Sequence, residues 1–96
     1  MTDSADTVAL TGDLDVAVAP DVRQRLDELL ARQASGVGIV DLRDVTFLDS
    51  AILGVLVGAA RRARDAGGDL EVHAPPPMVR RLFAVTGVDT VLTIRD

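Results

Sequence analysis

The sequence predicts an α/β protein with a mixed, mostly parallel four-stranded sheet and three helices packed on it. Short segments rich in β-branched residues alternate with longer segments of helical periodicity, in the order strand, helix, strand, helix, strand, helix, strand. Strands that alternate with helices of this length imply right-handed crossovers and a largely parallel sheet. The length of 96 residues and the hydrophobic content of 48% fit one domain over residues 1–96.

The first half of the chain predicts a strand, a helix and a second strand. Residues 7–11 (TVALT) favour a strand, and the acidic stretch GDLD at 12–15 favours a turn after it. A helix is expected to begin at Pro20 and to end near 35–36. Its apolar residues follow helical spacing: Val22, Leu26, Leu29 and Leu30. The run VGIVDLRDVTFL at 37–48 predicts a mostly buried strand.

The segment from Ser50 to the double glycine at 67–68 predicts a helix with two unlike faces. Residues 51–57 alone would also suit a strand, but the length of the segment and its glycine ending favour a helix. The face expected to pack on the sheet consists of Ile52, Leu53, Leu56, Ala59, Ala60 and Ala63. The outward face consists of Ser50, Gly54, Val57, Gly58 and Arg61. Such a smooth, weakly polar face suits close approach by another protein.

The last third of the chain predicts a strand, a helix and a final strand. Residues 69–73 (DLEVH) alternate polar and apolar side chains as a strand does. Three prolines at 75–77 then impose an extended link to a helix over 78–86, which Gly87 ends. Residues 90–94 (TVLTI) favour the final strand.

Composition excludes several classes of function. A net charge of −5 argues against nucleic acid as a partner, because phosphates require clustered cations. The chain has no cysteine, no lysine and a single histidine, so we expect no disulfide, no metal centre, no cofactor held by a lysine and no enzyme activity. The apolar run at 51–60 is about half the length of a membrane span, and residues 1–6 do not resemble a signal peptide. We therefore expect a cytoplasmic protein.

The segments that follow the first three strands are expected to share one edge of the sheet. These are GDLD at 12–15, LDSA at 48–51 and APPP at 74–77, and open parallel sheets usually carry function at this edge. Two interpretations of Ser50 are equally open on this basis. Its hydroxyl caps the following helix, worth about 1 kcal/mol, or it accepts a phosphate that the helix N-terminus tolerates.

Other polar residues have plainer explanations. The two aspartates of GDLD would suit acid/base chemistry, but acidic turn residues are usually solvated, and His73 is expected to be structural. Gly54 and Gly58 indicate close backbone packing rather than a membrane motif. The arginine pairs at 61–62 and 80–81 either end helices in solvent or contact a partner.

Three stretches resemble the STAS domain of bacterial anti-sigma factor antagonists, over nearly the whole chain. They are TGDLD at 11–15, VDLRDVTFLDSAILGVLVGAARRARDAGGDLEV at 40–72 and VRRLFAVTGVD at 79–89. In that family the serine directly after the aspartate is the phosphoacceptor of a serine kinase that is also the anti-sigma factor. The resemblance implies a STAS-like fold and gives the acceptor role to Ser50, beside Asp49 and the acidic loop of Asp15.

The resemblance also implies a regulatory cycle. The unphosphorylated antagonist binds the kinase and releases a sigma factor, phosphorylation of Ser50 blocks binding, and a serine phosphatase restores the first state. No catalytic group, cofactor or metal is needed on the antagonist itself. The expected partner-binding residues are Asp15, Asp49, Ser50, Gly54, Val57, Gly58 and Arg61.

The chain departs from the family pattern in three places. Ile52 replaces the usual glycine near the acceptor, no strand is expected before residue 7, and the chain stops at Asp96 where many members add a helix. We expect the shorter ends to expose a sheet edge that a partner or a second copy, in a weak homodimer, would cover. The alternatives are a STAS subunit bracing the ATPase of a lipid-transport ABC complex, in which threonine is expected at position 50, and an interaction module or nucleotide-binding domain in another signalling assembly.

Overall fold

The computed structural model describes residues 2–3, 6–33 and 36–96 and contains one five-stranded sheet in the order β1-β2-β3-β4-β5. β1 runs antiparallel to β2, and the remaining neighbours are parallel. The strands are β1 (Thr2–Asp3), β2 (Thr7–Leu14), β3 (Val37–Leu48), β4 (Asp69–His73) and β5 (Thr93–Arg95). The helices are α1 (Ala19–Arg32), α2 (Ser50–Asp65), α3 (Pro77–Thr86) and the short 3₁₀ helix η1 (Val88–Thr90). The predicted α/β architecture of a mixed, mostly parallel sheet with three α-helices is confirmed.

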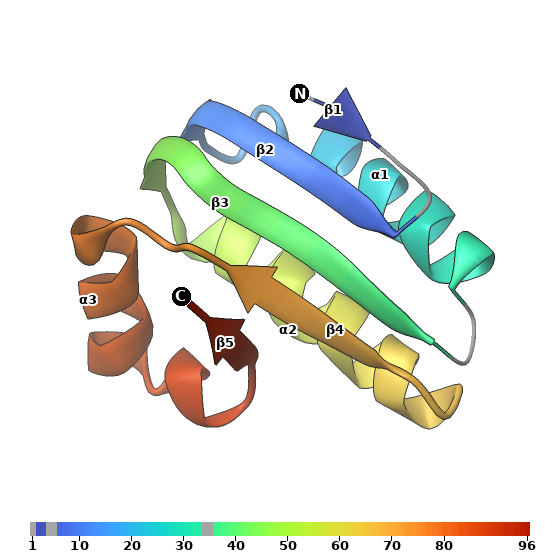
Figure 1. The fold of residues 1–96 in the computed structure, drawn as a ribbon. Coiled ribbons are helices and arrows are strands. Elements are labelled where there is room, and N and C mark those ends of the chain that lie inside the picture. Colours follow the sequence, from blue (N-terminus) through green and yellow to red (C-terminus); the bar gives the residue numbers. More distant parts are fainter. Residues whose placement is uncertain (1, 4–5, 34–35) are drawn as a thin grey trace.

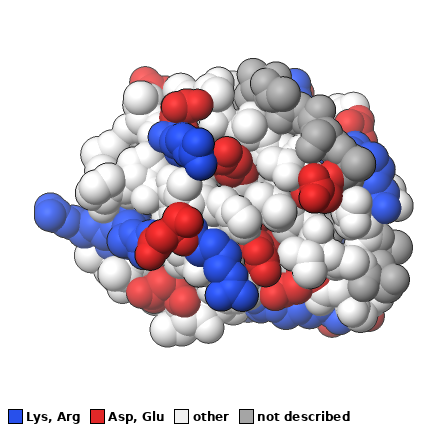
Figure 2. Space-filling model, in the orientation of Figure 1, with Lys and Arg blue, Asp and Glu red and all other residues white. Residues whose placement is uncertain are grey.

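The helices cover the sheet unequally. Figure 1 shows α1 and α2 on one face of the sheet and α3 beside one end of it, while the opposite face is open. Figure 2 shows this open face, on which arginines and acidic side chains are interspersed. Within the described ranges, no helix combines the length and apolar composition that a membrane span requires.

The core lies between the sheet and the helices α1 and α2. Alternate residues of β2 and β4 are buried, as a sheet with one covered face requires. The six residues predicted for the buried face of α2 are all buried: Ile52, Leu53, Leu56, Ala59, Ala60 and Ala63. Each fully buried Leu or Ile side chain contributes about 1.5–3 kcal/mol relative to an exposed one. This packing fixes α2, and with it the residues at its N-terminus, against the sheet.

Two predictions near the start of the chain are wrong. A strand does precede residue 7, because Thr2–Asp3 pairs antiparallel with β2. GDLD is also not a turn, since β2 continues to Leu14 and stays paired with β3. Gly12 has a φ of +78°, which glycine adopts without strain, and the register with β3 shifts next to it. Gly12 therefore marks a bulge within the strand.

The final strand is shorter than predicted. Residues 88–90 form η1 and Leu92 N donates to Val88 O, so helix-type hydrogen bonds occupy most of the segment assigned to the strand. Only Thr93–Arg95 pairs with β4. Gly87 ends α3 with a φ of +77°, as predicted. The first helix ends at Arg32, with Gln33 as its C-cap, and is therefore shorter than the expected end near 35–36, of which Ser35 lies outside the described residues.

Candidate partner-binding site

Asp15 and Asp49 follow paired positions on neighbouring parallel strands. Leu14 at the end of β2 pairs with Leu48 at the end of β3, and Asp49 N donates to Leu14 O at 3.1 Å. β4 is also parallel to β3, so its following segment leaves the same edge of the sheet. The predicted gathering of the three segments at one edge, called here the carboxyl edge, is confirmed.

Asp49, and not Ser50, caps α2. Asp49 is extended, with φ −105° and ψ −177°, and its Oδ1 accepts hydrogen bonds from Ala51 N at 3.0 Å and Ile52 N at 3.2 Å. The interpretation of Ser50 as the cap is therefore wrong. An aspartate is as good a cap as serine, and its charge also interacts favourably with the helix dipole.

Ser50 is the first residue of α2 and is exposed. Its hydroxyl makes no hydrogen bond within the part of the chain that the structure describes. Ile52, at the position where the antagonist pattern has glycine, has an exposed fraction of 0%, so its side chain lies in the core. A protein that approaches Ser50 therefore meets a free hydroxyl with no branched side chain over it.

The aspartates after Gly12 are held by local hydrogen bonds. Asp15 Oδ1 accepts from Ala17 N at 3.0 Å, and Asp15 O accepts from Val18 N at 3.1 Å, which turns the chain into α1. Asp13 accepts from the hydroxyl of Thr46 on β3. Both side chains are exposed, so Asp15 adds a solvated negative charge to the carboxyl edge.

The outward face of α2 is only partly as predicted. Ser50, Gly54 and Arg61 are exposed, whereas Gly58 is partly buried and Val57 is partly buried against the core. A Cβ added at Gly54 would meet nothing within 4 Å, and one added at Gly58 would lie 3.5 Å from Arg62 Nη1. Packing inside the chain therefore does not require either glycine.

A shallow groove separates α2 from α1 beside this face. It encloses about 240 Å³ and is lined by Arg23, Ala51, Gly54, Val55, Gly58 and Arg62. Arg62 is paired with Asp27 of α1 at 2.6 Å. This α1/α2 groove begins one residue from Ser50.

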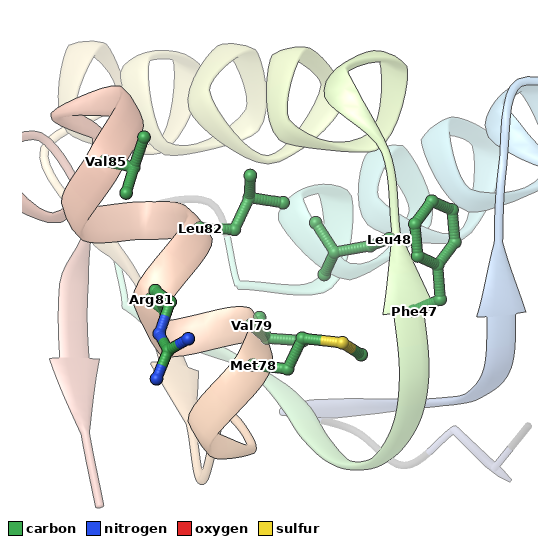
Figure 3. A pocket seen from close by; sticks show the side chains of 7 residues that line it. All are labelled: Phe47, Leu48, Met78, Val79, Arg81, Leu82 and Val85. Atoms are coloured by element: carbon green, nitrogen blue, oxygen red, sulfur yellow. The ribbon is translucent and has the colours of Figure 1, made fainter.

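A second, apolar groove, which the sequence did not predict, lies between the end of β3 and α3 (Figure 3). It encloses about 270 Å³ and is lined by Phe47, Leu48, Met78, Val79, Arg81, Leu82 and Val85. Three apolar lining residues are unusually exposed: Phe47 at 47%, Met78 at 56% and Val85 at 79%. The spacing of Met78, Leu82 and Val85 was a sequence signal for a second apolar face on α3. We call it the α3 groove, and Phe47 places it two residues from Asp49.

Several other charged residues form hydrogen bonds and ion pairs, some of which join elements of the fold. His73 Nε2 lies 2.9 Å from Glu71 Oε1, and Arg80 pairs with Asp96. Asp69 joins three elements by accepting from Leu70 N at 2.8 Å, Thr93 Oγ1 at 2.9 Å and Arg64 Nε at 3.1 Å. Burial acts to raise the pKa of Asp69, but these hydrogen bonds and the Arg64 charge together hold that pKa below its ordinary value.

The protein has a mostly parallel sheet that is open on one face. A helix that begins at Ser50 and is capped by Asp49 lies at the carboxyl edge of this sheet, and this arrangement defines the class of the protein. Residues 1–94 match the family described as "Mlab, STAS domain", and the chain belongs to the STAS-domain family.

Known relatives include named antagonists. The anti-sigma-B factor antagonist of Bacillus subtilis is 36% identical over 87 residues, which cover 91% of this chain and 78% of that protein. The anti-sigma F factor antagonist of Paenibacillus polymyxa is 32% identical over 89 residues, covering 93% and 76%. The crystal structure of an anti-sigma factor antagonist from Mycobacterium paratuberculosis superposes with a TM-score of 0.81 at 26% identity, over 98% of this chain and 80% of that one.

Proposed function

We propose that this chain is an anti-sigma factor antagonist that binds a cognate anti-sigma factor serine kinase while Ser50 is unphosphorylated. Binding releases a sigma factor, phosphorylation of Ser50 ends binding, and a serine phosphatase restores it. The observation that carries the proposal is the exposed, unbonded hydroxyl of Ser50, directly after the capping Asp49, in a chain 36% identical to a named antagonist. These partners act in the cytoplasm, which is the location we propose for the chain.

Electrostatic repulsion explains how one phosphate would end binding. Phosphoserine adds a charge of about −1.5 to −2 at neutral pH. It would lie beside Asp49, with the exposed Asp15 on the same edge, in a chain whose net charge is already −5. A partner docked against Ser50 would have to desolvate this charge, and leaving an ion unpaired in an interface costs several kcal/mol. A cost of about 2 kcal/mol or more lowers the affinity at least about 30-fold.

The surface around Ser50 has the composition of a protein-binding site. The α3 groove supplies exposed apolar side chains, and the outward face of α2 supplies a smooth surface with Gly54 near its centre. Asp15, Asp49 and Arg61 are polar residues on the same surface. An apolar centre with a polar rim is the common anatomy of interfaces between proteins.

Phosphorylation by the kinase tests the proposal directly. The protein is incubated with ATP and the small serine kinase encoded nearest to it, and the added phosphate is located by mass spectrometry. We expect one phosphate on Ser50 and none on the Ser50→Ala variant. No labelling by any neighbouring kinase, or labelling that persists in Ser50→Ala, would contradict the proposal.

Charge-matched variants test the binding step. We expect Ser50→Asp to weaken binding to the kinase and Ser50→Ala to retain it. Thr11→Asp adds the same charge at an exposed position of β2. Thr11 faces away from the helix-covered side of the sheet, because its neighbour Leu10 is buried on that side, so the variant should bind like the parent protein. Equal weakening by Ser50→Asp and Thr11→Asp would show an effect of net charge alone.

A second candidate is a STAS subunit that braces the ATPase of a lipid-transport ABC complex. The matched family is described by its STAS domain and not by a sigma pathway, so membership of the family is equally compatible with this second function. Co-purification with an ABC ATPase that is unaffected by Ser50→Asp would favour it over the antagonist role.

A further inference from the structure

We propose that Arg23 of α1 pairs with the phosphate on Ser50 once the protein is phosphorylated. This inference rests on the proposed phosphorylation of Ser50 and identifies the residue that holds the modified side chain. Four observations carry it: the occupied helix amides, the surrounding negative charge, the position of Arg23 and the engagement of the other arginines.

The N-terminus of α2 is already occupied. The amides of Ala51 and Ile52, which would otherwise face an anion, donate to the carboxylate of Asp49. A phosphate on Ser50 would have to displace that carboxylate to reach them. Because Asp49 also carries negative charge next to the phosphate, a cation from elsewhere in the chain is needed to offset the repulsion.

Arg23 is placed to supply that cation. It lines the α1/α2 groove together with Ala51 and Gly54, and Ala51 is the neighbour of Ser50 in α2. Arg23 is exposed and forms no hydrogen bond or ion pair with the residues that the structure describes. Gly54 leaves the space between the two helices open, since a Cβ there would contact nothing.

The other arginines of this surface are engaged or distant. Arg25 is paired with Asp21 at 3.4 Å, and Arg62 is paired with Asp27 at 2.6 Å. Arg61 is exposed but lies eleven residues beyond Ser50 in α2, about 16 Å along the helix axis. This distance exceeds the Debye length of about 10 Å at 0.1 M salt.

The pairing would give phosphorylation a second effect on partner binding. In the unmodified protein Arg23 has no ion-pair partner among the described residues and lines the groove that begins next to Ser50, so it is available to an acidic residue of a partner. In the phosphorylated protein its guanidinium would donate hydrogen bonds to the phosphate oxygens, a geometry that arginine suits well. Modification would therefore both add negative charge and remove a free positive one.

The pKa of the second phosphate ionisation tests this pairing. Phosphoserine is installed at position 50 during translation, so the sample does not depend on any kinase, and the pKa is followed by ³¹P NMR. A neighbouring guanidinium stabilises the dianion and lowers this pKa below its ordinary value of about 6. We expect the pKa in Arg23→Gln to be higher than in the parent by about 0.5 at about 0.1 M salt, and Arg23→Lys to restore part of the difference.

Arg61→Gln is the matched control, because it removes the same charge from an exposed residue of the same surface. We expect its phosphate pKa to equal that of the parent protein. Equal pKa values in the parent and Arg23→Gln, or equal rises in Arg23→Gln and Arg61→Gln, would overturn the pairing. Failure of the kinase to label Ser50 would instead contradict the proposed function. The pKa measurement would still decide the pairing with Arg23, because its phosphoserine is installed without a kinase.

Discussion

Adding one methyl group at Gly54 should change the stability of the fold and the affinity for a partner in opposite directions. Gly54 is an exposed residue inside the sixteen-residue helix α2, and a Cβ added there would have no neighbour within 4 Å. Alanine is favoured over glycine by about 1 kcal/mol in a helix interior. We therefore expect Gly54→Ala to stabilise the fold by about 1 kcal/mol, which corresponds to a rise in Tm of roughly 4–8 °C for a domain of this size.

The same methyl group should weaken partner binding. In the proposed complex the partner packs against the outward face of α2, and an extra methyl in a well-packed contact costs about 1–3 kcal/mol, or roughly 5- to 150-fold in affinity. Thermal unfolding and titration calorimetry with the anti-sigma factor measure the two effects. Ala31→Gly, at an exposed residue of α1, is the control, because it should lower stability without changing affinity.

Either of two results for Gly54→Ala would refute this reasoning. A lower Tm would mean that the fold itself requires glycine at position 54. A higher Tm with unchanged affinity would mean that no partner approaches this part of α2.

Three further outcomes follow from the capping aspartate, the joined strands and the α3 groove. Asp49→Ala removes the cap of α2 and should lower the free energy of unfolding by about 1 kcal/mol in urea denaturation, while Asp49→Asn keeps most of it; equal midpoints for all three proteins would contradict the capping role. The folded-state pKa of Asp69 is lowered, so its contribution to stability is complete above the unfolded-state pKa of about 3.9 and is lost as the pH falls through the lower folded-state value. Asp69→Asn should therefore reduce stability at pH 7 and flatten its decline below pH 4, and parallel pH profiles would argue against this. Phe47→Ser should reduce affinity for the anti-sigma factor at least tenfold with little loss of stability, because the side chain is 47% exposed, and unchanged binding would exclude the α3 groove from the interface.

Local patterns were sufficient for the elements whose boundaries depend on nearby residues. The helical spacing of apolar residues in α2 predicted its buried face residue by residue, and Gly87 predicted the end of α3. The predictions failed where distant pairing decides. β2 continues past Gly12 because β3 lies beside it, and β1 forms because Thr2–Asp3 pairs with β2.

In the candidate site, too, local sequence patterns predicted some features, while others depend on precise helix boundaries or tertiary packing. The exposure of Ser50 and Gly54 follows from helix periodicity, which the sequence contains. The choice of Asp49 over Ser50 as the cap depends on where the helix begins to within one residue, which periodicity does not resolve. The α3 groove depends on how α3 packs against the end of β3, and no local pattern specifies that contact.

The affinity of the anti-sigma factor for this protein with and without phosphate on Ser50 directly tests the proposed phosphorylation switch. Both forms are prepared with serine or phosphoserine at position 50 and titrated calorimetrically with the same anti-sigma factor. We expect the unmodified protein to bind and the phosphorylated form to bind at least about 30-fold more weakly, equivalent to about 2 kcal/mol. Equal affinities for the two forms would contradict the switch.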